Sequence, residues 1–285
     1  MRTGFVGLGY IGKPMAQQLP KAGLETTVFD IVPAPVQELV GAGAKGAASP
    51  REVAAASDVV GICVQSDAQV RAVITGEDGL LEGAEPGLVI AIHSTILPST
   101  AVEMNELAAK QDAQVVDACV SGNTRSADPQ FKLYVGGEPA QVEQIRPYLA
   151  AIAADRVIHA GPLGSGCKAK ICLNLVTYLQ WMAAFEGSAL AKATGLGIEM
   201  FERVGRSNGQ LTDMMCAYLG AHKLPEAALK ADAYQKYVHT QMLNAEKDLA
   251  CALDLARQEG VSLPGAALVS QLMARIYLID DAKRR

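Results

Sequence analysis

The sequence is short of aromatic side chains and has no excess of positive charge. Phe, Trp and Tyr make up 5% of its 285 residues, and 25 basic residues stand against 30 acidic ones, a net charge of −5. An acidic chain lacks the surplus of cations that neutralises a phosphate backbone, so we expect no nucleic-acid partner. Half of the residues are nevertheless hydrophobic, which indicates folded cores built mainly from Ala, Val, Leu and Ile.

Signals for disulfides, metal sites and membrane spans are also missing. The six cysteines never form C-x-x-C and the four histidines never form H-E-x-x-H, so we expect free thiols in a reducing compartment and no metal site. No apolar run reaches the roughly 18 residues of a membrane span. The longest, residues 171–190, is interrupted by Asn174, Gln180 and Glu186. With no signal-peptide pattern at the N-terminus, these absences predict a cytoplasmic protein without membrane contact.

Two kinds of sequence pattern divide the chain, whose length suits two domains of about 100–200 residues each. Up to residue 160, β-rich runs alternate with helical segments, which is typical of βαβ units around a parallel, doubly wound sheet. Strands are expected at residues 3–6, 26–29, 58–64, 88–93, 114–117, 133–136 and 156–160. Helices are expected at residues 14–22, 33–42, 68–75, 99–110 and 140–154, and from there on at 165–194, 198–206, 210–219, 237–259 and 264–282. The predicted fold class is an α/β sheet domain followed by an all-helical domain.

A glycine-rich turn follows the first expected strand. Its sequence is Gly7-Leu8-Gly9-Tyr10-Ile11-Gly12, and it opens a helix. In that context the pattern is the Rossmann dinucleotide fingerprint, in which the glycines allow a tight turn, close approach of a pyrophosphate and packing of the helix on the strand. A glycine-rich turn without a ligand is the alternative.

Asp30 closes the second expected strand, where a carboxylate binds the 2′-hydroxyl of an adenosine ribose. The same carboxylate repels the 2′-phosphate of NADP, and no arginine follows it in Ile31-Val32-Pro33. The predicted cofactor is therefore NAD, with NADP disfavoured by Asp30.

The long helix expected from residue 165 carries Lys170 and Asn174 four residues apart. They share one helix face, so an amine and an amide converge where they can hold a hydroxyl or carbonyl group. Lys168 lies about 200° round the helix from Lys170 and cannot serve the same site. The alternative is that these lysines are solvated surface charges.

A polar turn follows the expected strand at residues 114–117. Ser121, Gly122 and Asn123 offer backbone N–H groups and short side chains suited to a carboxylate, at the strand end where doubly wound folds bind ligands. An ordinary Ser-Gly-Asn turn is the alternative. Arg125, in the same loop, can pair with a second acidic group of a larger substrate, unless it is a solvated surface arginine.

Together the motifs resemble the β-hydroxyacid dehydrogenase family, which includes 3-hydroxyisobutyrate dehydrogenase and tartronate semialdehyde reductase and is related to 6-phosphogluconate dehydrogenase. The matching segments are residues 4–15, 93–98, 117–122, 161–174, 247–249 and 260–264. The resemblance implies hydride transfer between NAD and a small 3-hydroxy acid or its semialdehyde or keto form. It divides the chain into an NAD-binding Rossmann domain, residues 1–162, and an all-helical substrate and oligomerisation domain, residues 163–285.

The resemblance also assigns roles to individual residues. Lys170 matches the catalytic general acid and base, and Asn174 the amide that holds the substrate. The other matched positions are the substrate-carboxylate residues Ser121 and Gly122, the nicotinamide-lining Thr95, the ribose- and phosphate-contacting Val64 and Gln65, and Lys247 near cofactor or substrate. The chain departs from the family pattern in the loop at residues 123–129, and in Gln65-Ser66-Asp67, where relatives often carry a Pro-centred segment. Leu173 also replaces the first of two asparagines common in relatives. These departures leave the substrate unnamed.

Two other functions are compatible with this two-domain organisation. An imine or ketone reductase has the same two domains, but relatives of the imine type lack a lysine at position 170. A non-catalytic NAD-binding protein would need the glycines but not Lys170, Asn174 and Ser121 together.

The long helix is apolar on more than one face, and relatives associate through this domain, so a homodimer or homotetramer is expected. Burial of that helix within one subunit is the alternative.

Overall fold

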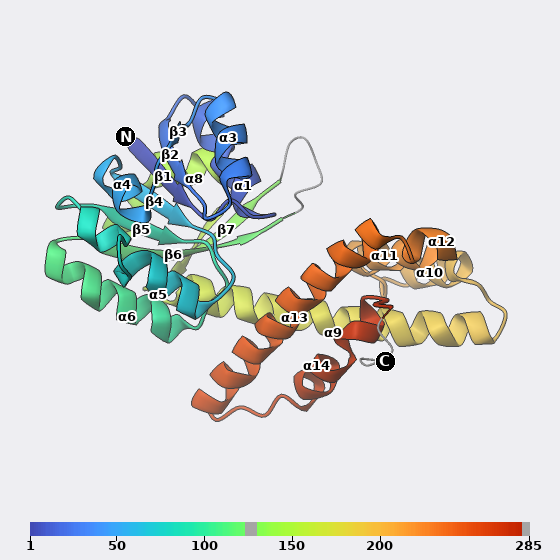
Figure 1. Cartoon of the computed structure of the whole chain (residues 1–285). Coiled ribbons are helices and arrows are strands. Elements are labelled where there is room, and N and C mark those ends of the chain that lie inside the picture. Colours follow the sequence, from blue (N-terminus) through green and yellow to red (C-terminus); the bar gives the residue numbers. More distant parts are fainter. Residues whose placement is uncertain (123–129, 281–285) are drawn as a thin grey trace. The chain divides into compact units, whose positions relative to one another are not determined.

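One eight-stranded sheet organises the N-terminal part of the chain, in the strand order β3-β2-β1-β4-β5-β6-β7-β8 (Figure 1). The strands are β1 (Arg2–Val6), β2 (Glu25–Phe29), β3 (Lys45–Gly46), β4 (Val59–Ile62), β5 (Val89–Ile92), β6 (Gln114–Ser121), β7 (Lys132–Gly136) and β8 (Val157–Gly161). The computed structural model describes residues 1–122 and 130–280. The chain divides into two compact units, Met1–Lys170 and Ile171–Arg285. From β1 the strand order runs outward through β2 to β3 and then resumes on the other side of β1 with β4. This switch point between β1 and β4 places a ligand-binding crevice at the carboxyl ends of these two strands.

Helices cover both faces of this sheet. They are α1 (Gly12–Ala16), α2 (Gln18–Lys21), α3 (Pro33–Gly41), α4 (Pro50–Ala55), α5 (Asp67–Thr75), α6 (Pro98–Ala108), α7 (Pro139–Gln144) and α8 (Arg146–Ala153), with 3₁₀ turns η1 (Leu80–Gly83) and η2 (Ala109–Gln111). One apolar core joins α1, α2, α3, α7 and α8 to the sheet, and a second joins α4, α5 and α6 to its other face. Strands β4 and β5 are buried along their whole length, as central strands covered on both faces are.

The parallel sheet that the sequence predicts contains one antiparallel strand pair. Strand β6 pairs antiparallel with β7, whereas the other pairs are parallel. The expected strand at 114–117 also continues to Ser121. The segment between the two strands, residues 122–131, is shorter than the crossover of about a dozen residues that a parallel partner requires.

Prolines and short elements account for other differences from the elements expected in the sheet unit. The helix expected at 140–154 is two helices, α7 and α8, because Pro147 cannot donate a helical hydrogen bond and Ile145 leaves helical geometry. The helix expected at 14–22 is likewise divided into α1 and α2. Strand β3 has two residues and α4 has six, too few for a periodic signal.

The buried ring of His93 joins the sheet to α8. Its Nδ1 lies 2.7 Å from the carbonyl oxygen of Ala118 and its Nε2 lies 2.7 Å from the hydroxyl of Tyr148. Because a carbonyl only accepts, Nδ1 carries the proton and the Tyr148 hydroxyl donates to Nε2. Burial lowers the pKa of His93 to about 4, against the hydrogen bond to Ala118, which raises it. The imidazole is therefore neutral in the folded protein at neutral pH.

This burial predicts a loss of stability in mild acid. The unfolded chain binds a proton at His93 below its ordinary pKa of 6.5, whereas the folded protein does so only near 4, so stability falls as pH falls between these values. From pH 7 to pH 5 the expected loss is about 2 kcal/mol of unfolding free energy. Urea denaturation at both pH values measures it, with His93→Gln reducing the difference and the exposed His239→Gln leaving it unchanged. An unchanged difference in His93→Gln contradicts the assignment.

The C-terminal unit is helical. Its helices are α9 (Ser165–Ala193), which begins in the sheet unit, α10 (Ile198–Ser207), α11 (Asp213–Leu219), α12 (Glu226–Leu229), α13 (Asp232–Gln258) and α14 (Pro264–Ile276), with the 3₁₀ turn η3 (Ala221–Lys223). Their core contains Tyr178, Met242, Leu249, Val269 and Met273. In this unit α13 begins five residues before the expected 237, α14 ends at Ile276 within the expected 264–282, and α11 begins three residues after the expected 210. An α/β sheet domain followed by a helical domain is thus confirmed as the fold class. Among the described residues, no helix is long and apolar enough to cross a membrane.

The expected end of the long helix at Gly195 is confirmed. Gly195 has φ +79° and donates its N–H to the carbonyl of Lys192, while Leu196 donates to that of Ala191. This pair of bonds is the Schellman arrangement, which needs a left-handed residue after the helix. Glycine adopts that conformation without steric cost.

Candidate active site

The glycine-rich turn has the geometry that its sequence pattern predicts. Gly7 has φ +91° and donates its N–H to the carbonyl of Phe29, which ties the turn to β2. A Cβ atom on Gly12 would lie 1.9 Å from the carbonyl oxygen of Gly7, whereas a Cβ on Gly9 would meet no atom within 4 Å. Gly12 therefore permits the packing of helix on strand, and Gly9 leaves an open approach to the backbone. A cofactor pyrophosphate fits at that open side.

Asp30 stands beside this turn at the end of β2. Its Oδ2 accepts a hydrogen bond from the backbone N–H of Leu8 at 2.5 Å, and its Oδ1 accepts from that of Val32 at 2.8 Å. One carboxylate thus holds the glycine-rich turn against the end of the neighbouring strand. It remains half-buried, so its oxygens can also accept from a ribose hydroxyl.

The turns that follow β4 and β5 are tied to each other. Val64 donates its backbone N–H to the Ser94 hydroxyl at 2.8 Å, one residue before Thr95. Asp67 accepts from the backbone N–H of Leu97 at 3.0 Å and from the Thr100 hydroxyl at 2.6 Å. The expected cofactor positions in these turns are thereby brought to one edge of the sheet.

The unusual Gln65-Ser66-Asp67 segment has a structural explanation. The Ser66 hydroxyl accepts from the backbone N–H of Gln69 and so caps α5. Asp67 then makes the bridge to the turn after β5. The sequence motifs did not identify Ser94, Ser66 and Asp67 as positioning groups. A serine followed by an acidic residue before a helical run is the N-cap signal that identifies two of them.

The substrate-loop residues are only partly described. Ser121 is the last residue of β6 and is half-buried, and Gly122 follows it with φ +151°. Asn123 and Arg125 lie outside the described residues. Ser121 and Gly122 thus stand at the carboxyl end of a sheet strand, as predicted.

Lys170 lies in the second turn of α9 and is half-buried, whereas Lys168 is exposed. The start of α9 is fixed to β6 by Asp117. The Asp117 carboxylate accepts from the backbone N–H of Gly164 at 2.7 Å and from that of Cys167 at 2.6 Å. These two hydrogen bonds therefore fix the position of Lys170 relative to β6, the strand that ends in Ser121.

Asn174 is fixed by a buried carboxylate of the helical unit. Its Nδ2 donates to Oδ2 of Asp248 at 2.7 Å, and the Tyr178 hydroxyl donates to the same oxygen at 2.9 Å. Lys247 Nζ lies 2.8 Å from Oδ1 of Asp248. This network brings together Asn174 and Lys247, both predicted, and adds Asp248 and Tyr178, which the motif analysis missed. A carboxylate on the apolar side of a helix is the available signal, since a buried charge requires donors.

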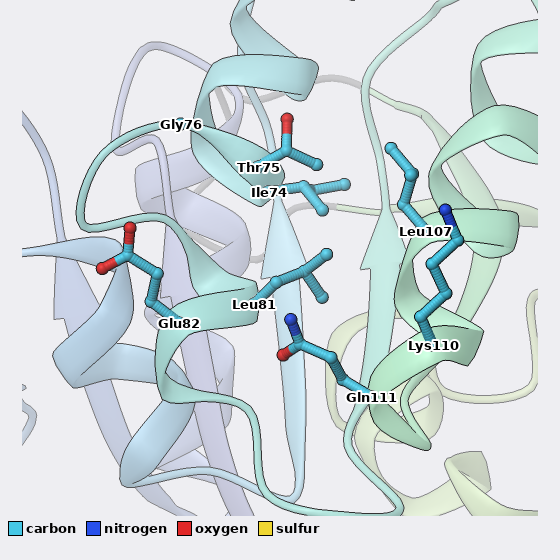
Figure 2. A pocket seen from close by; sticks show the side chains of 8 residues that line it. All are labelled: Ile74, Thr75, Gly76, Leu81, Glu82, Leu107, Lys110 and Gln111. Carbon is cyan, nitrogen blue, oxygen red and sulfur yellow. The ribbon is translucent and has the colours of Figure 1, made fainter.

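Two cavities are lined by residues other than these. One of about 280 Å³ lies where α5, η1 and α6 meet, and Figure 2 shows Leu81, Leu107 and Lys110 among its lining side chains. It is at the C-terminal ends of α5 and α6, hence at the sheet edge opposite the glycine-rich turn. A second, of about 340 Å³, is lined by Phe185, Leu229 and Ile279 among others. Among the described residues no group of three or more His, Cys, Asp or Glu could hold a metal ion.

The glycine geometry predicts separable effects of two substitutions. Gly9→Ala adds a methyl group where the protein has open space, so we expect an unchanged Tm and at least about 10-fold weaker NADH binding, because the pyrophosphate loses its approach. Gly12→Ala places the methyl group against the Gly7 carbonyl, so we expect a lowered Tm as well. Thermal denaturation and NADH fluorescence titration measure both. Unweakened NADH binding by a folded Gly9→Ala variant contradicts the assignment.

Comparison with known proteins agrees with this arrangement. Residues 2–161 match the NAD binding domain of 6-phosphogluconate dehydrogenase, and residues 164–281 match the domain described as NAD-binding of NADP-dependent 3-hydroxyisobutyrate dehydrogenase. An NAD-dependent L-serine dehydrogenase of Pseudomonas aeruginosa is 32% identical over 281 residues, covering 98% of this chain and 93% of that protein. A 2-(hydroxymethyl)glutarate dehydrogenase of Eubacterium barkeri is 32% identical over 274 residues, covering 95% and 88%. The crystal structure of a 3-hydroxyisobutyrate dehydrogenase from Salmonella typhimurium has a TM-score of 0.81 at 27% identity, covering 96% of this chain and 93% of that one.

The fold and these relatives define an NAD(P)-dependent oxidoreductase that acts on the CH–OH group of hydroxy acids. Within that class, the chain belongs to the β-hydroxyacid dehydrogenase family of 3-hydroxyisobutyrate dehydrogenase, with a nucleotide-binding domain of the 6-phosphogluconate dehydrogenase type. The resemblance that the motifs indicated is thereby confirmed.

Proposed function

We propose that the chain interconverts a small 3-hydroxy carboxylic acid and its semialdehyde or keto form, with NAD as cofactor and Lys170 as general acid and base. The observation that carries this proposal is the placement of Lys170 and Asn174 one turn apart on α9, with the amide of Asn174 oriented by Asp248. An amine and a fixed amide on one helix face suit a hydroxyl group that becomes a carbonyl group.

Each residue has one task in this reaction. NAD, when bound, supplies the hydride acceptor. In oxidation Lys170 takes the proton of the substrate hydroxyl, and in reduction it returns that proton. The Nδ2 group of Asn174 carries two hydrogens, one of which is donated to Asp248; the other is donated to the substrate oxygen, where negative charge develops. Ser121 and Gly122 bind the substrate carboxylate, and Thr95 lines the nicotinamide side of the cofactor site.

The cofactor is NAD in this proposal, with NADP disfavoured by Asp30. The Asp30 carboxylate is fixed by the backbone N–H groups of Leu8 and Val32 at the end of β2. A fixed negative charge there accepts from a ribose hydroxyl and repels a 2′-phosphate. Val64, Gln65, Tyr10 and Ile11 complete the proposed contacts to the cofactor, and Lys247 lies near cofactor or substrate.

A substrate panel tests the proposed reaction. The protein is mixed with NAD⁺ or NADP⁺ and with 3-hydroxyisobutyrate, L-serine or 2-(hydroxymethyl)glutarate, the substrates named by its relatives, and with a cyclic secondary amine. We expect the absorbance of the reduced nicotinamide to rise with at least one hydroxy acid and with no amine. Turnover of the amine alone would indicate an imine reductase, and NAD binding without any turnover would indicate a non-catalytic protein.

We also propose that the helical unit forms a homodimer or homotetramer. Apolar side chains are exposed on several of its helices, including Leu190 at 67%, Val204 at 54% and Leu268 at 53% exposure. A second copy of the chain would cover side chains of this kind if they form one contiguous patch. Light scattering after gel filtration measures the assembly, and a monomer at micromolar concentration contradicts the proposal.

A further inference from the structure

We propose that Asp117 is a positioning residue for Lys170, a buried carboxylate that fixes the start of α9 to the strand carrying Ser121. The inference rests on the proposed function, because it assumes that Lys170 transfers the proton. In this inference Asp117 sets the distance between Lys170, the proton-transfer group, and Ser121, which is proposed to bind the substrate carboxylate.

Asp117 uses both of its oxygens on the first turn of α9. Oδ1 accepts from the backbone N–H of Gly164 and Oδ2 from that of Cys167, at 2.7 and 2.6 Å, and the side chain is fully buried. The first N–H groups of a helix have no partner within the helix. A charged acceptor meets this need better than a neutral one, because hydrogen bonds to an ionised group are shorter and stronger than those between neutral groups.

The backbone around Asp117 leaves little freedom for α9 to move inward. A Cβ on Gly166 would lie 2.3 Å from the carbonyl oxygen of Tyr134 and 2.7 Å from that of Asp117. A Cβ on Gly136 would lie 2.3 Å from Oδ1 of Asp117. The helix therefore rests directly on the backbones of β6 and β7, and the carboxylate holds it there.

Two short chain segments connect this anchor to the proposed chemistry. Lys170 follows Cys167 by three residues, about one helical turn, or a rise of about 4.5 Å along α9. Ser121 follows Asp117 by four residues of extended strand, or about 13 Å. Both segments are regular elements, so a shift of the anchored turn moves Lys170 relative to Ser121.

Burial raises the pKa of Asp117 above its usual range, and the hydrogen bonds from Cys167 and Gly164 counteract that rise. The two bonds thus favour the ionised form inside the protein. An asparagine at this position has one acceptor oxygen and an NH₂ group, so it would set N–H against N–H on one side of the turn. Asp117→Asn therefore changes the anchor while nearly preserving the side-chain volume.

The experiment compares Asp117→Asn, Gly166→Ala, the double variant and the control Asp155→Asn, whose side chain is 93% exposed. Misplacement of a reacting group by about 1 Å can cost about 100-fold in rate, so we expect each single variant to lower kcat by about 10-fold to 100-fold. NADH affinity should change less than about 2-fold, because the glycine-rich turn and Asp30 follow β1 and β2, away from β6 in the strand order. The double variant should lose less than the product of the single losses, because both act on one helix turn. The control should match the unmodified protein.

Three results would overturn the inference while leaving the proposed function intact: kcat within 2-fold of normal in a folded Asp117→Asn variant, equal losses of kcat and NADH affinity, or multiplicative losses in the double variant. Failure of the proposed function is recognised separately, by a Lys170→Ala variant that retains turnover.

Hydrogen exchange of the unmodified protein provides a test that does not depend on folding of a variant. The Gly164 and Cys167 amides are expected to exchange slowly, since both donate to a buried acceptor. The amide of Gly9, in the exposed part of the glycine-rich turn, serves as the fast reference. Exchange of the Gly164 and Cys167 amides as fast as that of Gly9 would contradict the anchor.

Discussion

Replacing Lys170 by alanine is expected to reduce kcat by about 1,000-fold while the affinity for NADH changes less than about 2-fold. General acid–base groups contribute about 100-fold to 10,000-fold to rates. The glycine-rich turn follows β1 and Asp30 follows β2, so we expect cofactor binding not to depend on this side chain. Steady-state kinetics and NADH fluorescence titration measure the two quantities.

Lys168→Ala is the matched control for this prediction. It removes the same charge two residues earlier on the same helix, from an exposed position on another face. It should retain turnover, and added methylamine should restore part of the activity of Lys170→Ala but not change that of Lys168→Ala. Near-normal turnover of Lys170→Ala excludes a catalytic role for this lysine.

Replacing Asp30 by alanine is expected to lower kcat/KM for NAD by about 10-fold to 100-fold, because a hydrogen bond to a charged group contributes about 1.5–3 kcal/mol. The same substitution removes the repulsion of a 2′-phosphate, so the ratio of NADP to NAD efficiency should rise by at least that factor. Kinetics with both cofactors at saturating substrate measure the ratio.

Glu25→Gln is the control for the change of charge. Glu25 begins the strand that Asp30 closes, at the opposite edge of the sheet, so its loss should leave the NADP to NAD ratio unchanged. The unmodified protein should favour NAD. A native preference for NADP would show that the Asp30 carboxylate does not select the cofactor.

The local periodicity of the sequence was sufficient for most of the fold. Buried strands such as β4 and amphipathic helices such as α5 each carry their pattern within a few residues. Pairing direction carries no such pattern, and the antiparallel β6–β7 pair depends on the length of the connection between two strands. A two-residue strand such as β3 forms only because β2 lies beside it.

The residues of the candidate site likewise fall into those whose partners are close in sequence and those whose partners are distant. Gly7 to Gly12 could be predicted because their roles depend on neighbouring residues in one turn. Asp117 and Asp248 could not, because their partners Gly164 and Asn174 lie 47 and 74 residues away in sequence. A buried carboxylate is recognised by its donors, and those are brought to it only by the fold.

The most direct test of the proposed reaction is the transfer of a label from substrate to cofactor. A 3-hydroxy acid that the protein oxidises, carrying deuterium on its hydroxyl-bearing carbon, is incubated with NAD⁺, and the reduced cofactor is analysed by mass spectrometry and NMR. Direct hydride transfer predicts NADH that carries one deuterium, at C4 of the nicotinamide ring. NADH without deuterium, or deuterium released to water, would contradict hydride transfer between a hydroxy acid and NAD.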